Sequence, residues 1–563
     1  MNKKHPYLTP KLITSLRGYT SQQLIKDIVA GIIVAIIALP LSIALALASG
    51  VEPAAGVYTA ITAGFVIALF GGSRVQISGP TAAFATIVAG IVATQGMSGL
   101  IIATIMAGIM LILMGVFKLG ALIKFIPYTI TTGFTAGIAV TIFIGQIKDF
   151  LGLTYADGVK PVETMEKLEA NIEAMSTFSW QALLVGAVCL AILIIYPRFE
   201  KRVPPSLIAV IVGVLMVKFI PGLDAGVFTI GELYTIPTGL PSFTLGSLDL
   251  SWSKITDLMP SAFTIAILAA IESLLSCVVA DSMINSRHNS NMELVAQGLG
   301  NIASALFGGI PATGAIARTA ANVKNGGRTP IAGRVHAVVL LIMLLFLMPL
   351  AGLIPMPTIA AILFMVAYNM CGWRSFVQVI KTAPVSDILV MVITFVLTVV
   401  FDLVVAIEVG MILAAMLFMK SMSEQTNVSG WKYAEDAETP ERDADSITLR
   451  HVPHHVRVYE VSGPLFFGAA DKILDITLKE YTTCLILRMR GVPAVDATAM
   501  GSLESLYDKC HKKGVQLIFS HVNEQPLAVM KHGGYFDKVG ADHFCDHIDS
   551  ALEFAATFAP DQE

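Results

Sequence analysis

Apolar runs long enough to cross a membrane follow one another from about Asp27 to Lys420, separated by short polar breaks. Because a helix needs about 20 residues to cross the apolar core of a bilayer, this region has room for about twelve to fourteen crossings. Only 14% of the 563 residues are charged, compared with about a quarter in a typical soluble protein. The sequence therefore predicts a polytopic α-helical membrane protein.

The breaks place fourteen spans in two groups of seven. The groups occupy about 27–221 and 259–420, within a transmembrane domain of 27–420 that follows an N-terminal segment of 1–26. The predicted spans are 28–49, 54–71, 80–94, 97–117, 125–147, 179–196, 205–221, 259–280, 293–307, 313–323, 333–354, 357–371, 384–404 and 406–420.

Lysine and arginine gather in alternate breaks, as expected for loops on the cytoplasmic side of a membrane. The two longest breaks on the other side, 149–178 and 222–258, lean acidic. Lys3, Lys4 and Lys11 precede a first run that is too long for a cleavable signal. Both termini are therefore predicted to lie in the cytoplasm. The basic residues of the breaks are Arg74, Lys118, Lys124, Arg198, Lys201, Arg202, Arg287, Lys324, Arg328, Arg334, Arg374, Lys381 and Lys420.

Two predicted spans, 80–94 and 313–323, are short for a bilayer, and each begins beside a proline, Pro80 or Pro311, with a threonine close behind. Proline favours the first position of a helix, so we expect both helices to start there. One such span alone is most simply a proline-kinked helix. Two of them, entered from opposite sides of the membrane, predict facing helix N-termini whose free N–H groups and dipoles attract an anion. This is the inverted-repeat pattern of secondary transporters.

Glu272 lies near the middle of the eighth predicted span, and Arg318 lies in the tenth. Ionisable residues at bilayer depth usually face a cavity and act on ions or protons. A carboxylate beside a bound anion would repel it unless the carboxylate is protonated or paired, which predicts proton–anion symport through Glu272. The alternatives are a buried Glu272–Arg318 ion pair and, for Arg318, a side chain that extends to the cytoplasmic interface. Ser42 and Ser273 either pack helices or line the site.

The chain changes character after Lys420. Residues 421–446 are polar and acidic and are predicted to be a linker, and 447–560 are predicted to be a small α/β domain. The histidines and cysteines of this domain lack standard zinc spacing, so neither a metal nor a cofactor is predicted. Asp496 or Thr498 is interpreted as the N-cap of the predicted helix that follows. A net charge of -4 gives no indication of nucleic-acid binding, and no nucleophile–base or phosphate-loop pattern indicates an enzyme.

These features together resemble the sulfate permease (SulP) family of anion transporters. The stretches that carry the resemblance are 40–46, 56–58, 71–74 and 78–81, and the tail resembles a STAS domain. The resemblance implies two inverted repeats of seven spans that form core and gate domains, elevator-like movement, a homodimer and a location in the bacterial inner membrane. It also implies Glu272 at the coupling-ion position and an anion surrounded by Leu41, Leu45, Ala82, Ala83, Thr313, Gly314, Ala317 and Arg318.

Two departures from the family pattern narrow the prediction. The family's sulfate carriers usually have glutamine and an aromatic residue where this chain has Leu41 and Leu45. This less polar pocket resembles the bacterial branch that carries four-carbon dicarboxylates such as succinate, fumarate or aspartate. In the tail, Ala497 stands where regulatory STAS domains have a phosphorylatable serine, which excludes a phosphoswitch at that position. A soluble partner such as acyl carrier protein, as in related bacterial members, stays open.

We therefore predict a membrane transporter that couples the uptake of a small carboxylate to protons. Within transport, the alternatives are sulfate or bicarbonate as the substrate and sodium as the coupling ion. Outside transport, the alternative is a transporter-like sensor that signals through the STAS domain without net flux. Flux into proteoliposomes distinguishes the sensor from the transporter, and sodium independence of uptake excludes sodium symport.

Overall fold

The computed structural model describes residues 8–16, 18–121, 127–156, 159, 161–199, 203–235, 239–241, 243, 251–401, 403–430 and 452–558. Contacts within the chain divide it into two compact units, Met1–Ile412 and Leu413–Glu563. Each unit is described by itself, the first as the membrane domain and the second as the C-terminal unit.

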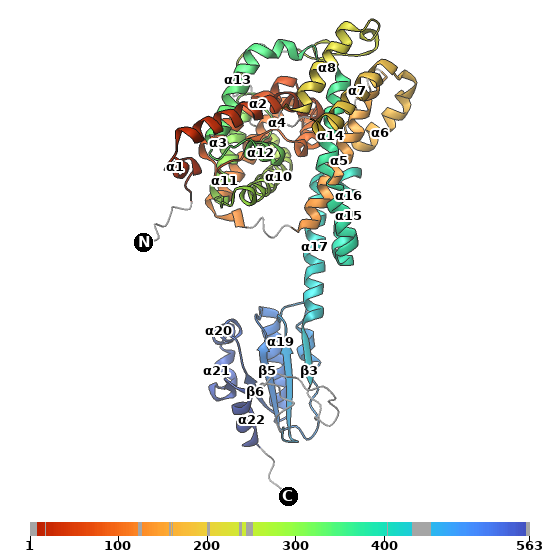
Figure 1. Cartoon of the computed structure of the whole chain (residues 1–563). Coiled ribbons are helices and arrows are strands. Elements are labelled where there is room, and N and C mark those ends of the chain that lie inside the picture. The colour runs from red at the N-terminus through yellow and green to blue at the C-terminus, as the bar shows by residue number, and fades with distance from the viewer. Residues whose placement is uncertain are drawn as a thin grey trace. The chain divides into compact units, whose positions relative to one another are not determined.

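The membrane domain consists almost entirely of helices (Figure 1). Within the described residues, nine helices of the chain are long and apolar enough to cross a membrane, and α8 and α16 are shorter apolar helices. Every predicted span overlaps a helix, because the length and apolarity of a run are enough to locate a crossing. The helices are α1 (Lys11–Ser15), α2 (Ser21–Ala48), α3 (Pro53–Phe70), α4 (Ala85–Val116), α5 (Tyr128–Leu151), α6 (Thr164–Glu173), α7 (Trp180–Ile195), α8 (Pro205–Phe219), α9 (Ile230–Leu233), α10 (Trp252–Ile284), α11 (Ser290–Leu306), α12 (Ile316–Lys324), α13 (Ile331–Ala351), α14 (Met356–Cys371), α15 (Trp373–Thr382), α16 (Val385–Val400) and α17 (Leu403–Gln425).

These helices pack as two bundles (Figure 1). In the first bundle α11 packs against α3 and α4, α10 packs against α4 and α12, and α13 packs against α2 and α3. In the second bundle α5 packs against α7, α14 and α16, and α7 also packs against α8 and α14. Helix α2 contacts α8 and α14 as well, so it borders both bundles. The first bundle corresponds to the expected core domain and the second to the expected gate domain.

The two short spans meet at a backbone ladder in the first bundle. Strand β1 (Ser78–Gly79) pairs antiparallel with β2 (Thr313–Gly314). A 3-10 helix (Ala82–Phe84) follows β1 and leads into α4, and α12 follows β2. The prediction that both helices start at a proline is wrong, since Pro80 and Pro311 lie in the non-helical segments ahead of the helices. The ladder keeps each chain extended beside its proline, and the helix begins only after it.

The third and fourth predicted spans are two parts of α4. They are separated at Gly96, whose φ of 69° and ψ of -175° are not helical. Glycine adopts a positive φ without the steric cost that a side chain would bring, so the kink falls at this residue. The part of α4 that follows β1 is thus short, like α12.

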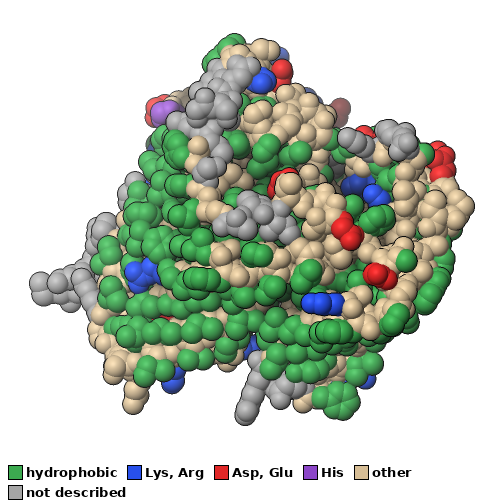
Figure 2. All heavy atoms as spheres, turned by 90° about the horizontal axis from the view of Figure 1, so that it is seen from above, with side chains coloured by type: hydrophobic (Ala, Val, Ile, Leu, Met, Phe, Trp, Pro, Cys, Tyr) green, Lys and Arg blue, Asp and Glu red, His purple; other side chains and the backbone are tan. Residues whose placement is uncertain are grey.

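Apolar side chains cover much of the surface, and Figure 2 shows one face on which charged side chains are few and scattered. Exposed apolar areas of this extent are unusual in a soluble protein. They are expected where the surrounding medium is lipid. Examples on three helices are Ile25, Val29 and Ile32 of α2, Phe346 and Leu350 of α13, and Val409, Met411 and Ile412 of α17.

The C-terminal unit is built on a mixed sheet with the strand order β3-β4-β5-β6-β7. Strand β3 is antiparallel to β4, and the other neighbours are parallel. Along β5, Leu485 and Leu487 join a buried cluster with α19, and Ile486 joins a second cluster with α22, so helices cover both faces. The elements are β3 (Asn427–Gly430), β4 (Val456–Ser462), α18 (Asp471–Leu474), β5 (Cys484–Gly491), α19 (Ala497–Lys512), β6 (Gln516–Ser520), α20 (Glu524–His532), α21 (Tyr535–Val539), β7 (Phe544–Cys545) and α22 (Ile548–Ala556).

The first residues of the expected linker, 421–446, form regular structure. Helix α17 runs to Gln425, and β3 follows it almost at once. The Nζ of Lys472 donates hydrogen bonds of 2.6 and 2.5 Å to the carbonyl oxygens of Ser423 and Thr426. A lysine that satisfies the last carbonyls of a helix stabilises its end. The start of this segment is therefore ordered by the C-terminal unit, and its acidic residues from 435 onward lie outside the described residues.

Candidate functional site

The β1–β2 ladder brings the two half-helices of the membrane domain together, and two of its glycines leave room for buried polar side chains beside it. A Cβ on Gly314 would lie 2.2 Å from Nε2 of Gln76, and a Cβ on Gly79 would lie 2.7 Å from Nη1 of Arg318. Contacts this short do not occur in stable packing, so a larger residue at either position would displace a buried polar side chain. Glycine at these two positions therefore leaves room for the Gln76 and Arg318 side chains beside the ladder.

Unpaired N–H groups surround the ladder on both of its sides. Within the described residues, no hydrogen-bond acceptor is found for the main-chain N–H groups of Ala82 and Ala83, which start the 3-10 helix. The same holds in that part of the chain for Ile316 and Ala317, which start α12. Such groups, together with the positive end of the helix dipole, favour a negative charge in front of them. Each half-helix thus begins with unpaired donors next to the ladder. That the two sets of donors share one anion stays a prediction.

Glu272 and Arg318 are bonded to the neighbouring residues Thr81 and Pro80. The Thr81 hydroxyl donates to Oε2 of Glu272 at 2.9 Å. Arg318 is only 2% exposed, and its Nη2 donates to the carbonyl oxygen of Pro80. The structure differs from both alternatives for these residues. In the described part of the chain Glu272 and Arg318 form no direct ion pair, and Arg318 is too buried to extend to the membrane interface.

Thr313 and Ser273 fasten β2 to α10. Their hydroxyl oxygens are 2.7 Å apart, and the Thr313 hydroxyl also donates to the carbonyl oxygen of Ala269 at 3.2 Å. Oγ of Ser273 accepts from the N–H of Gly314 at 3.1 Å. Because a hydroxyl has one proton to donate, the proton of Thr313 is used inside the protein. Thr313 therefore positions β2 and offers no free hydroxyl donor in this structure.

The remaining predicted site residues lie on three elements around the ladder. Leu41 and Leu45 are on α2, which packs against both α4 and α12. Leu45, Ala82 and Ala83 are buried, Leu41 is half-buried, and Ala317 is exposed in the first turn of α12. The structure brings the elements that carry all of these residues together. Direct contact between each side chain and an anion stays a prediction.

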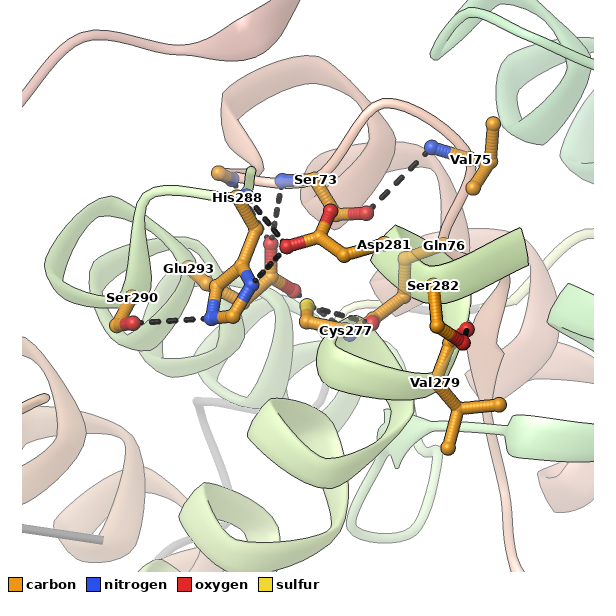
Figure 3. A network of polar contacts seen from close by, with 11 residues as sticks. Ser73, Val75, Gln76, Cys277, Val279, Asp281, Ser282, His288, Ser290 and Glu293 are labelled. Carbon is orange, nitrogen blue, oxygen red and sulfur yellow. Dashed lines mark hydrogen bonds and ion pairs between the residues drawn. The ribbon is translucent and has the colours of Figure 1, made fainter. Parts of the chain in front are cut away.

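Sequence reasoning missed Glu293 of α11, a carboxylate that is fully buried (Figure 3). Its Oε2 accepts from the main-chain N–H groups of Gly72 and Ser73 at 2.8 and 3.1 Å. Its Oε1 accepts from the Nε2 atoms of Gln76 and Gln297 at 2.8 and 2.9 Å. These four donors provide the charge-assisted hydrogen bonds that a buried carboxylate requires. Glu293 thereby joins α11 to the segment between α3 and β1.

Two amides continue from Glu293 to the ladder. Nε2 of Gln297 also donates to the Ser78 hydroxyl of β1 at 3.2 Å. One helical turn further along α11, Asn301 bonds both main-chain groups of Ala312, accepting from its N–H at 2.8 Å and donating to its carbonyl at 2.9 Å. Helix α11 therefore supports β1 and β2 from the same side. This polar framework fixes where the two half-helices start.

Asp281, Asp402 and Glu408 lie near the ends of predicted spans, where capping or ion pairs are expected, and Asp281 has such a structural role. Oδ2 of Asp281 accepts from the main-chain N and from Nδ1 of His288 at 2.8 and 2.7 Å, which closes the turn between α10 and α11 (Figure 3). In the C-terminal unit, Oδ1 of Asp496 accepts from the N–H of Ala499 at 2.9 Å, so the predicted cap is formed by Asp496 and not by Thr498. Asp402 lies outside the described residues.

Residues 24–394 match the Sulfate permease family, and residues 446–551 match the STAS domain. The chain belongs to the sulfate permease family. This SulP chain is 40% identical over 543 residues to "Putative sulfate transporter YvdB" of Bacillus subtilis (strain 168), covering 95% of this chain and 98% of the relative. It is 32% identical to "Bicarbonate transporter BicA" of a Picosynechococcus species, covering 94% of each chain.

The solved structure of the murine Slc26a9 anion transporter in the inward-facing state has the same fold. The TM-score is 0.87 at 18% identity, covering 98% of this chain and 94% of that chain. The predicted SulP fold class is therefore confirmed, with a helical transporter core and a C-terminal STAS domain that holds a mixed sheet. As a SulP protein, the chain is a multi-pass membrane anion transporter and not an enzyme.

Proposed function

We propose that this anion transporter is a proton-coupled symporter in which Glu272 carries the proton. The observation that carries the proposal is the hydrogen bond between Glu272 and Thr81, because it places a carboxylate at the start of one of two half-helices with free N–H groups. An ionised carboxylate there would repel any anion bound to those groups. Protonation removes the repulsion, so proton and anion bind together.

The charge balance of the site supports the same coupling. With Glu272 ionised, its negative charge offsets the buried positive charge of Arg318. With Glu272 protonated, the positive charge of Arg318 is uncompensated, and a bound anion neutralises it. Arg318 need not touch the anion for this effect, since charges interact over several ångströms in a medium of low dielectric constant. Sodium bound beside Glu272 would satisfy the same balance and is the alternative coupling ion.

Sulfate is the substrate that the observations support best. The name of the Bacillus relative gives sulfate, and that relative is similar over nearly the whole of both chains. A four-carbon dicarboxylate is the second candidate, because the Leu41 and Leu45 side chains make the α2 side of the site apolar. Sulfate and a dicarboxylate both carry negatively charged oxygen atoms, which helix N-termini bind.

Bicarbonate fits proton coupling less well, although two cyanobacterial relatives are named for it. A bicarbonate ion together with a proton is chemically equivalent to carbon dioxide and water, and carbon dioxide crosses lipid without a carrier. Bicarbonate taken up with a proton could therefore leave again as carbon dioxide, and the proton gradient would drive little accumulation. Bicarbonate would become the leading substrate if uptake required sodium in place of protons.

We further propose that the first bundle moves as one body against the second, as in an elevator. The ladder and the Glu293 framework connect α4, α11 and α12 through main-chain and buried polar hydrogen bonds, which resist separation. The homodimer, the inner-membrane location with both termini in the cytoplasm, and a soluble partner of the STAS domain such as acyl carrier protein rest on the family resemblance. They stay proposals here.

The first test is uptake of labelled sulfate and labelled succinate into proteoliposomes with an inward proton gradient, with bicarbonate as a competitor. We expect sulfate to accumulate without sodium and to be released when a protonophore collapses the gradient. Accumulation of succinate that resists sulfate would replace sulfate by the dicarboxylate. A strict sodium requirement would refute proton coupling, and the absence of any flux would favour the sensor.

The second test is the Glu272→Gln variant, which keeps the shape of the side chain and removes its titration. We expect loss of gradient-driven accumulation with retention of anion exchange across the membrane. Glu408→Gln is the matched control, because Glu408 is an exposed carboxylate of α17, in the last predicted span. Accumulation by the Glu272→Gln variant under a pH gradient would show that Glu272 is not the proton carrier.

A further inference from the structure

Thr81 directly precedes the free N–H groups of the first half-helix, and its hydroxyl is bonded to Glu272. Thr81 occupies the N-cap position of the 3-10 helix in extended conformation, with φ of -129° and ψ of 159°, yet its side chain makes no capping hydrogen bond. A threonine at this position usually accepts a hydrogen bond from an N–H group of its helix. Here the side chain bonds Glu272 instead, and the N–H groups of Ala82 and Ala83 are left without an acceptor within the described residues.

The number of protons decides what Thr81 can offer to an anion. A hydroxyl has one proton and two lone pairs, and an ionised carboxylate can only accept. While Glu272 is ionised, the Thr81 proton is therefore committed to Oε2 of Glu272, and only lone pairs remain to face the site. Once Glu272 is protonated, the acid can donate to Oγ1 of Thr81. The Thr81 proton is then available to an anion.

We propose that Thr81 is the positioning residue that links the proton on Glu272 to the anion. Protonation of Glu272 reverses the hydrogen bond between the two side chains and turns Thr81 from a repulsive neighbour of the anion into a donor. The reversal needs only rotation of the hydroxyl, so it requires no movement of the backbone. This inference rests on the proposed role of Glu272 and adds a second residue to the coupling.

The test compares Thr81→Val, which keeps the shape without the hydroxyl, with Thr81→Ser, which keeps the hydroxyl. The full-length variants are reconstituted in proteoliposomes, and the KM for labelled sulfate, or for succinate if that is the anion accumulated, is measured as a function of external pH. A hydrogen bond to a charged group corresponds to about tenfold or more in affinity. We expect Thr81→Val to raise KM by about that factor at acidic pH and to change it little at alkaline pH. We expect Thr81→Ser to keep the wild-type dependence of KM on pH.

The Glu272→Gln background gives an independent measurement. Its amide N–H donates to Thr81 at every pH, as the protonated acid would, so adding Thr81→Val should weaken anion binding in exchange assays regardless of pH. A merely structural role of Thr81 would shift the KM of the single variant equally at all pH values, and this result would overturn the proposal. An unchanged KM in Thr81→Val, or equal behaviour of the serine and valine variants, would overturn it as well.

The two proposals can fail separately. If Glu272→Gln still accumulates substrate under a proton gradient, the assignment of Glu272 is refuted whatever Thr81 does. If Glu272→Gln loses accumulation while Thr81→Val keeps the wild-type dependence of KM on pH, only the role of Thr81 is refuted.

Discussion

Glu293→Gln is the change that most directly tests whether the buried polar framework holds the transport site in place. The carboxylate accepts four hydrogen bonds, two on each oxygen. All four donors are N–H groups, which cannot act as acceptors. Glutamine replaces one oxygen by an amide nitrogen. If the amide nitrogen faces the N–H groups of Gly72 and Ser73, two donors face another donor and two hydrogen bonds are lost. If it faces Gln76 and Gln297, those amides must turn over to accept, which breaks the hydrogen bonds that they make with Cys277 and Ser78.

The size of the effect follows from these two bonds. A hydrogen bond to a charged group contributes about 1.5–3 kcal/mol, so the loss of two lowers the free energy of unfolding by about 3–6 kcal/mol. The Glu272→Gln variant is the natural comparison, because a glutamine at position 272 can still bond the Thr81 hydroxyl. Its expected cost is about 1 kcal/mol or less. The two glutamate variants should therefore differ clearly in stability.

The assay is thermal unfolding of the purified full-length protein in detergent, followed by intrinsic fluorescence. We expect Glu293→Gln to unfold at least about 5 °C below the wild type and Glu272→Gln to unfold close to it. In transport assays the Glu272→Gln variant should be folded but should no longer couple anion uptake to the proton gradient. If Glu293→Gln melts within about 1 °C of the wild type, the four hydrogen bonds do not hold the framework together.

Three further outcomes are expected. Arg318→Ala should raise the KM for the transported anion by about tenfold or more in uptake assays, and an unchanged KM would show that its charge does not act on the anion. Gly79→Ala should reproduce part of this loss, because its Cβ would meet Nη1 of Arg318, whereas Gly90→Ala, with nothing within 4 Å of its Cβ, is the matched control. Burial raises the pKa of the Cys484 thiol to about 12 and that of Cys510 to about 11. Neither should react with a maleimide at neutral pH until the STAS domain is unfolded, since only the thiolate is reactive; rapid labelling of the folded protein would contradict the burial.

Local signals in the sequence were enough to predict the architecture. Each apolar run reports its own crossing, because the requirement for about 20 apolar residues acts on each segment by itself. The prolines at positions 80 and 311 marked the two interrupted spans, because proline is not accommodated in the interior of a regular helix. The predicted region of the anion site rests on these local features.

Features made by distant segments were missed or misplaced. The helix starts were assigned to the prolines because a local rule does not include the pairing of β1 with β2. Glu293 is bonded to Gly72, 221 residues away, and no spacing in the sequence indicates such a partner. A usable signal was nevertheless present. Glu293, Gln297 and Asn301 recur at every fourth position of an otherwise apolar run, which places three polar side chains on one face of a helix.

The ladder between β1 and β2 has a consequence for how this family can diversify. Its hydrogen bonds join main-chain groups, so the side chains expected around the anion, such as Ala82, Ala83 and Ala317, are not the ones that hold the two half-helices together. These alanines can be exchanged while the pairing persists. A new anion preference can therefore arise through a few substitutions on an unchanged frame, in agreement with relatives that are named for different anions.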